Sequence, residues 1–144
     1  MVLVVAECRR WRVSLSHGIM HIVVRDLPAS FDGIAQTVSV LVREPGLDGI
    51  RVLIDCTELP PAQEPPPLGY LERLADVLYP LNLAARNVRC ALVVRGQSFT
   101  WRARFLIAKV SSTTIEWRMF GESSRALVWL GAPDESTAHR GDGT

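Results

Sequence analysis

The chain has 144 residues, of which 48% are hydrophobic and 22% are charged, and its formal net charge at pH 7 is +1. This length is enough for a full hydrophobic core, so we expect a single domain over residues 1–133. The near-zero net charge argues against nucleic acid as a partner, and no uncharged apolar run approaches the ~18 residues that stable membrane insertion needs.

The first predicted elements are the two strands of a β-hairpin. Trp11, Val13 and Leu15 alternate with polar residues, which is the period of two of a half-buried strand. A His-Gly turn at residues 17–18 follows. Residues 19–25 are rich in β-branched side chains and form the second strand of the predicted hairpin.

The next segment is predicted to be an amphipathic helix that begins after Ser30 and ends at the Pro-Gly pair of residues 45–46. Its apolar residues recur at the spacing of one helical face: Phe31, Ile34, Val38 and Leu41.

Residues 50–56 form a nearly continuous apolar run, which is typical of a central strand covered on both faces. A proline-rich loop over residues 60–67 follows. The second predicted helix then places its apolar side chains on one face and stops near Pro80. These apolar residues are Leu71, Leu74, Ala75 and Leu78.

Residues 88–95 are predicted to be a second buried strand, and residues 114–120 a final one. Between them, Ser98 is expected to cap a third helix that runs to about Val110.

The last predicted helix starts at a serine cap, Ser123 or Ser124, and runs to Leu130. Gly131 and Pro133 are typical helix-stop residues. The tail from residue 134 to residue 144 is polar and without periodicity, so we expect it to be disordered.

The order of these elements predicts an α/β fold with a mixed sheet. Strands that alternate with helices imply right-handed crossovers and parallel pairing, which we expect for the last three strands. The expected architecture is therefore an N-terminal β-hairpin, three parallel strands and about four helices.

Two segments carry a resemblance to a known family. Ile115–Pro133 reads IEWRMFGESSRALVWLGAP, and Ile50–Leu59 reads IRVLIDCTEL, a central strand that ends in Asp. In this order they resemble the SpoIIAA-like group of the STAS superfamily, whose fold is related to the lipid-binding CRAL-TRIO modules. The resemblance covers about Trp11 to Pro133. It implies a STAS-like fold and, through the CRAL-TRIO relation, a small amphipathic ligand held between helices and sheet.

The chain departs from one pattern of that superfamily. Antagonists of anti-sigma factors in the superfamily carry a phosphorylated Ser or Thr at the helix start after the central strand. Here the matching loop, Thr57–Leu68, is rich in proline, and Thr57 is its only hydroxyl residue. Because Thr57 lies too close to the strand end, a phosphoswitch of that type is not expected.

The candidate ligand site is the rim at the carboxyl ends of the parallel strands, where open α/β sheets bind their ligands. Free N–H groups at the start of the third helix could hold an anion there beside arginine. The alternative is that Ser98 only caps the helix, Arg95 is solvated and Trp101 belongs to the core. The candidate ligand-binding residues are Asp55, Thr57, Arg95, Ser98, Trp101 and Arg102.

Metal, cofactor and catalytic motifs are missing from the sequence. His17 and His21 have no nearby ligand set, and the cysteines Cys8, Cys56 and Cys90 form no metal-binding spacing. We therefore expect no metal, no cofactor and no catalytic residue. The odd number of cysteines fits a reducing compartment, and the short apolar N-terminus lacks the features of a signal peptide, so a cytoplasmic location is expected.

Three functional hypotheses follow. The first is a non-enzymatic domain that binds an unknown protein partner or a small amphipathic ligand. The second is a small enzyme that uses the strand-end rim around Asp55, Cys56, Arg95 and Ser98. The third is a self-associating subunit, a homodimer, that pairs through the hairpin strand at a sheet edge or through a tryptophan face. The tryptophans considered for that face are Trp11, Trp117 and Trp129.

Overall fold

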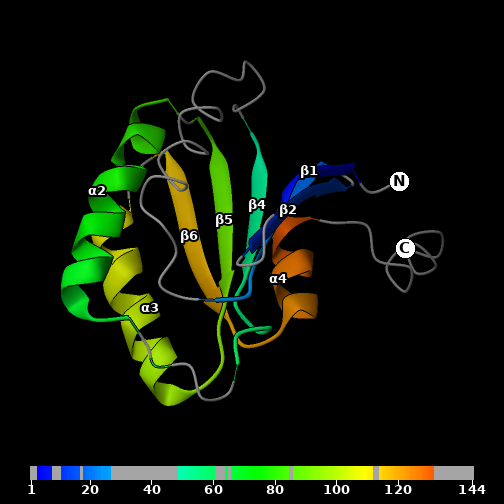
Figure 1. Cartoon of the computed structure of the whole chain (residues 1–144). Helices are drawn as coiled ribbons and strands as arrows, with labels where there is room; N and C mark the ends of the chain where they lie inside the picture. The colour runs from blue at the N-terminus through cyan, green and yellow to red at the C-terminus, as the bar shows by residue number, and fades with distance from the viewer. Residues whose placement is uncertain are drawn as a thin grey trace.

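The chain folds into an α/β structure with one mixed sheet and helices on both of its faces (Figure 1). It is known from a computed structural model. The described residues are 3–7, 11–16, 18–26, 49–60, 64, 66–84, 86–111 and 114–131.

In the described residues the sheet has six strands, and their order in space is their order in the chain. The pairs β1·β2 and β2·β3 are antiparallel, whereas β3·β4, β4·β5 and β5·β6 are parallel. The parallel pairing of the last three strands is therefore confirmed. The strands are β1 (Leu3–Glu7), β2 (Trp11–Ser16), β3 (Ile19–Val24), β4 (Arg51–Asp55), β5 (Val88–Val93) and β6 (Ile115–Phe120).

The predicted hairpin is confirmed as β2 and β3, but its position at a sheet edge is wrong. Strand β1 pairs with β2 and forms the edge, and the sequence analysis predicted no strand there. The segment before residue 8 is a short apolar run without alternation, so periodicity does not identify it as a strand. Its pairing partner β2 decides its conformation.

The described residues contain three helices, α2 (Leu68–Ala84), α3 (Gln97–Val110) and α4 (Ser123–Leu130). In Figure 1, α2 and α3 lie together on one side of the sheet, and α4 lies on the other. The helix predicted after Ser30 and the predicted disordered tail both lie outside the described residues.

Three predicted helix boundaries are wrong. Helix α2 does not stop at Pro80 but continues to Ala84, with the proline inside it. Neither serine cap forms: α3 begins after Gly96 and α4 after Glu122, and neither helix has a side-chain cap hydrogen bond. The predicted stop at Gly131 is confirmed, because this glycine adopts the left-handed conformation that ends helices.

The two faces of the sheet bury different side chains, since successive residues of a strand point to opposite faces. Toward α4, Leu53 and Val93 pack against Ala126 and Leu130. Toward α3, Leu92 packs with partners that include Val94, Ala103, Phe99 and Ile107. This separation decides which face each polar residue at the strand ends can reach. None of the three described helices is both long enough and apolar enough to cross a membrane.

Candidate functional site

The buried carboxylate of Asp55 lies at the carboxyl end of β4. Its Oδ1 accepts a hydrogen bond from the Thr57 backbone N–H at 2.8 Å and one from the Thr57 hydroxyl at 2.6 Å. An aspartate that binds the backbone two residues later forms an Asx turn. Asp55 and Thr57, both predicted site residues, therefore lie together and fix the first turn of the loop.

Two further side chains approach the other oxygen of this carboxylate. The Ser123 hydroxyl, at the start of α4, donates to Asp55 Oδ2 at 3.4 Å. His21 Nε2, from β3, lies 3.8 Å from the same oxygen, is itself buried and has no hydrogen-bond partner. The cluster thus ties β3, β4 and α4 together.

This arrangement differs from that of a hydrolase triad. In such a triad the histidine stands between the serine and the carboxylate, so that it can take the serine proton. Here Ser123 and His21 each approach Asp55 directly. The geometry supports an anchor for the strand-end loop and the start of α4.

Cys56 follows Asp55 and packs on the α3 face of the sheet. Burial, and after it the charge of Asp55, raises the pKa of the Cys56 thiol to about 12. The thiolate is the nucleophilic form of cysteine, and at neutral pH this side chain stays protonated. Cys56 is therefore unsuited to act as a nucleophile in the hypothesis of an enzyme at the strand-end rim.

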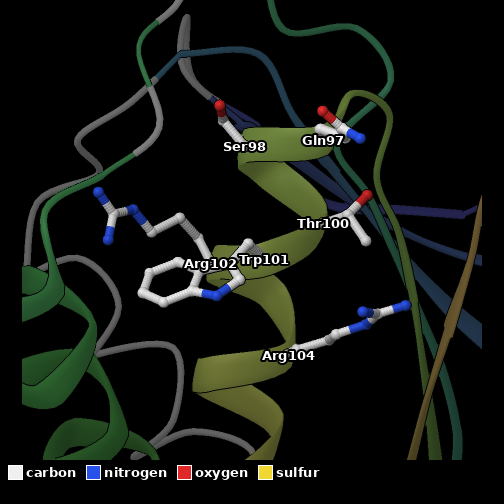
Figure 2. Close-up of a pocket in the computed structure, with 6 residues that line it drawn as sticks. All are labelled: Gln97, Ser98, Thr100, Trp101, Arg102 and Arg104. Atoms are coloured by element: carbon white, nitrogen blue, oxygen red, sulfur yellow. The ribbon is translucent and has the colours of Figure 1, made fainter.

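A second group of polar residues surrounds the first turns of α3. An open hollow of about 590 Å³ lies there, and among the described residues those that line it come from this helix (Figure 2). Trp101 and Arg102 extend to one side of the helix, whereas Thr100 and Arg104 extend to the other. The lining residues are Gln97, Ser98, Thr100, Trp101, Arg102 and Arg104.

Trp101 is the large aromatic residue of this hollow, and it is 55% exposed. The guanidinium carbon of Arg102 lies 4.9 Å from the centroid of the Trp101 ring, which is within the range of a cation–π contact. The alternative interpretation of Trp101 as a core residue is wrong. The interpretation of Ser98 as a cap is also wrong, because Ser98 is exposed in the first turn and makes no cap bond.

The surface of α3 around this hollow is positively charged. Arg95 precedes the helix and is exposed, Arg104 is exposed, and the first turn contains no acidic residue. Within the described residues, neither these two arginines nor Arg102 forms an ion pair with a carboxylate. Arg95 is exposed, as the alternative interpretation of a solvated side chain predicted.

The six predicted site residues do not share one pocket. Asp55 faces α4, whereas Ser98, Trp101 and Arg102 belong to the helix on the opposite face. Arg95 is not among the residues that line the hollow. All six lie at or just after the carboxyl end of a parallel strand, as predicted. The sheet nevertheless separates Asp55 from the residues of α3, because neighbouring residues of a strand point to opposite faces.

Sequence reasoning missed His21 and Ser123 as neighbours of Asp55. The register that brings His21 beside Leu53 and close to Asp55 comes only from strand pairing. Sequence reasoning also missed Arg104, although the spacing of four residues from Thr100 is a signal that both share one helical face. His17 lies outside the described residues. In the described part of the chain, no three potential metal ligands converge.

Comparisons with known proteins leave the chain without an assigned family. No family model, curated protein or solved structure matches it significantly.

Proposed function

We propose that this chain is a non-enzymatic binding domain that docks an acidic segment of a protein partner on the exposed surface of α3. The observation that carries the proposal is Trp101, a large aromatic side chain that is 55% exposed and stacked by Arg102 beside an open hollow. Tryptophan and arginine are the side chains most enriched among the residues that dominate binding energy at protein interfaces.

Charge favours an acidic partner. Arg95, Arg102 and Arg104 carry positive charge near one helix start, and no carboxylate in the described part of the chain pairs with them. The helix start adds a partial positive charge of its own. An acidic segment would supply the missing carboxylates, and arginine can bind each of them through two hydrogen bonds.

We further propose that the fold is of the STAS-like, SpoIIAA-like type. The support is the order of hairpin, parallel strands and alternating helices, together with the Asp that ends β4. The Thr57 hydroxyl is engaged by Asp55, which agrees with the proposed absence of a phosphoswitch at this position. A small amphipathic ligand is the other occupant that the family resemblance suggests for such a domain.

The test is a matched series of fluorescein-labelled peptides of equal length, with Leu at the apolar positions and Glu, Gln or Lys at the polar positions. Fluorescence anisotropy measures the Kd of each peptide. We expect the Glu peptide to bind most tightly. Trp101→Ala and Arg102→Glu should each weaken its binding at least about tenfold, since each removes a central aromatic or cationic contact.

The matched control is Arg125→Glu on α4, because Arg125 is also an exposed helical arginine, with 80% of its side chain accessible. This variant should bind the Glu peptide like the wild type. The proposal would be contradicted if the Glu and Lys peptides bound equally well. It would also be contradicted if Arg125→Glu weakened binding of the Glu peptide as much as Trp101→Ala and Arg102→Glu do. If the protein bound vesicles of anionic phospholipid through Trp101 but did not bind the Glu peptide, the partner would be a membrane surface and not a protein.

A further inference from the structure

Helix α2 presents a stripe of four exposed side chains to solvent. They recur at intervals of three and four residues, so they share one face of the helix. The members of this α2 stripe are Glu72, Asp76, Tyr79 and Leu83. Tyr79 is 57% exposed and Leu83 is 70% exposed. Single exposed apolar side chains are ordinary, but two that lie one helical turn apart form a patch of the kind that marks an interaction site.

The other half of the α2 stripe is acidic. Glu72 and Asp76 are exposed, and in the described part of the chain no arginine or lysine forms an ion pair with either carboxylate. The surface of α3 carries the complementary groups, since the aromatic ring of Trp101 and the guanidinium of Arg104 are both exposed there. The chain therefore has both halves of one interface, an acidic and apolar face on α2 and a basic and aromatic face on α3.

The two faces lie on the same side of the sheet and at matching heights. Helices α2 and α3 pack against each other there (Figure 1), and each connects two parallel strands, so they run in the same direction. Near their carboxyl ends, the Asn82 side chain donates to the Val110 carbonyl at 3.3 Å. Asp76 lies six residues before Asn82, and Arg104 lies six residues before Val110. At a rise of ~1.5 Å per residue, both are ~9 Å from this contact.

We infer that two copies of this chain form a symmetric dimer in which α2 of each copy packs on α3 of the other. A two-fold axis that runs parallel to the helices, between α2 and α3, places each α2 over the partner's α3 and keeps every height unchanged. Asp76 then lies beside the partner subunit's Arg104, and the reverse pair forms by symmetry. The inference rests on the proposed function, since it identifies the acidic segment that α3 binds as α2 of a second copy.

The apolar end of the α2 stripe also meets a suitable surface in this arrangement. Tyr79 lies three residues before Asn82, and Ala108 lies two residues before Val110. Ala108 is exposed and small, so the Tyr79 ring can cover it in the partner subunit. The dimer thus buries exposed aromatic rings between charged pairs, which is the usual composition of a protein interface.

Sedimentation velocity over a range of concentrations tests this dimer. The wild type should shift from a species of 16.0 kDa to one of twice that mass as the concentration rises. Asp76→Arg and Arg104→Asp each place two like-charged pairs across the interface, so each should raise the dimer Kd at least about tenfold. An equal mixture of the two variants should form a heterodimer about as tight as the wild-type dimer, because both of its cross-subunit pairs have opposite signs.

Rescue in the mixture is also the folding control, since it requires two folded chains. Arg125→Glu, on α4, is the matched surface control and should dimerise like the wild type. At concentrations below the dimer Kd the chain is a monomer, so substitutions at Asp76 should leave its free energy of unfolding nearly unchanged. The inference would be overturned by a wild type that is monomeric at every concentration, by single variants that dimerise as well as the wild type, or by a mixture that stays monomeric.

The Glu peptide separates this inference from the proposed function. Asp76→Arg leaves the α3 surface intact, so this variant should be a monomer that still binds the peptide, and excess peptide should convert the wild-type dimer to monomer. A monomeric wild type that binds the Glu peptide would overturn the dimer alone. A wild type that neither dimerises nor binds the peptide would overturn both.

Discussion

At the scale of single residues, Asp55 shows how one buried carboxylate organises a strand end. It accepts two hydrogen bonds from Thr57 and contacts Ser123 of α4. Removing the carboxylate leaves the Thr57 N–H and hydroxyl without their acceptor. Asp55→Ala should therefore lower the free energy of unfolding by about 1–3 kcal/mol, measured by urea denaturation.

The control for this measurement is Asp76→Ala, which removes an exposed aspartate from α2. This change should alter the free energy of unfolding by less than about 0.5 kcal/mol. An Asp55→Ala protein as stable as the control would show that the Asx turn does not hold the loop. Asp55→Asn keeps one acceptor oxygen, so its free energy of unfolding should lie between those of Asp55→Ala and the control.

The half-buried thiol of Cys56 and the buried thiol of Cys90 give a prediction on pH. Burial raises the pKa of both Cys56 and Cys90 from the usual thiol value of 9.0 to about 12, and the charge of Asp55 contributes to the rise at Cys56. Because the folded pKa is higher, the thiol contribution to stability is fully present below pH 9 and is lost as the pH rises toward 12. A Cys8→Ser protein should react with a disulfide reagent at pH 8 at least about 100-fold more slowly when folded than in denaturant. Rapid reaction of the folded protein would contradict the burial of these thiols.

At the scale of elements, helix α2 contains Pro80, which was predicted to end the helix but lies inside it. Pro80 is exposed and stands four residues before the last residue of the helix. It has no backbone N–H, so the carbonyl of Asp76 lacks its helical partner. Pro80→Ala should raise the free energy of unfolding by up to about 3 kcal/mol, measured by urea denaturation.

The matched control is Pro67→Ala, because Pro67 lies just before the first residue of α2 and a proline there costs the helix no hydrogen bond. It should leave stability nearly unchanged. Equal effects of the two substitutions would show that the proline inside α2 is not a source of strain. The packing of α2 against α3 explains why the helix tolerates it, since tertiary contacts override local propensity.

The elements themselves were predicted well where periodicity is strong. The alternation at Trp11, Val13 and Leu15 identifies β2, and the apolar runs identify β4 and β5. The boundaries and caps were less predictable. Ser98 and Ser123 have the right residue type for a cap, but α3 begins two residues earlier than a Ser98 cap requires and α4 one residue earlier than a Ser123 cap requires. The Ser123 hydroxyl contacts Asp55 instead.

At the scale of the whole molecule, the sheet separates two groups of polar residues. The Asp55 cluster faces α4, whereas the Trp101 hollow lies on α3, on the opposite side of the sheet. The substitutions at Asp55 change the α4 side of the sheet, whereas those at Trp101 and Arg102 change α3. A loss of stability and a loss of acidic-peptide binding are therefore distinguishable in the same set of variants.

The sequence by itself determined the α/β class, the hairpin, the parallel pairing of the last strands and the Asp55 and Thr57 strand end. These follow from local periodicity and from the handedness of crossovers. Only the tertiary structure decided that β1 forms the edge, that His21 and Ser123 approach Asp55, and that Trp101 is exposed. The physical reason is that register and the choice of face depend on contacts between residues far apart in the chain, which no local pattern records.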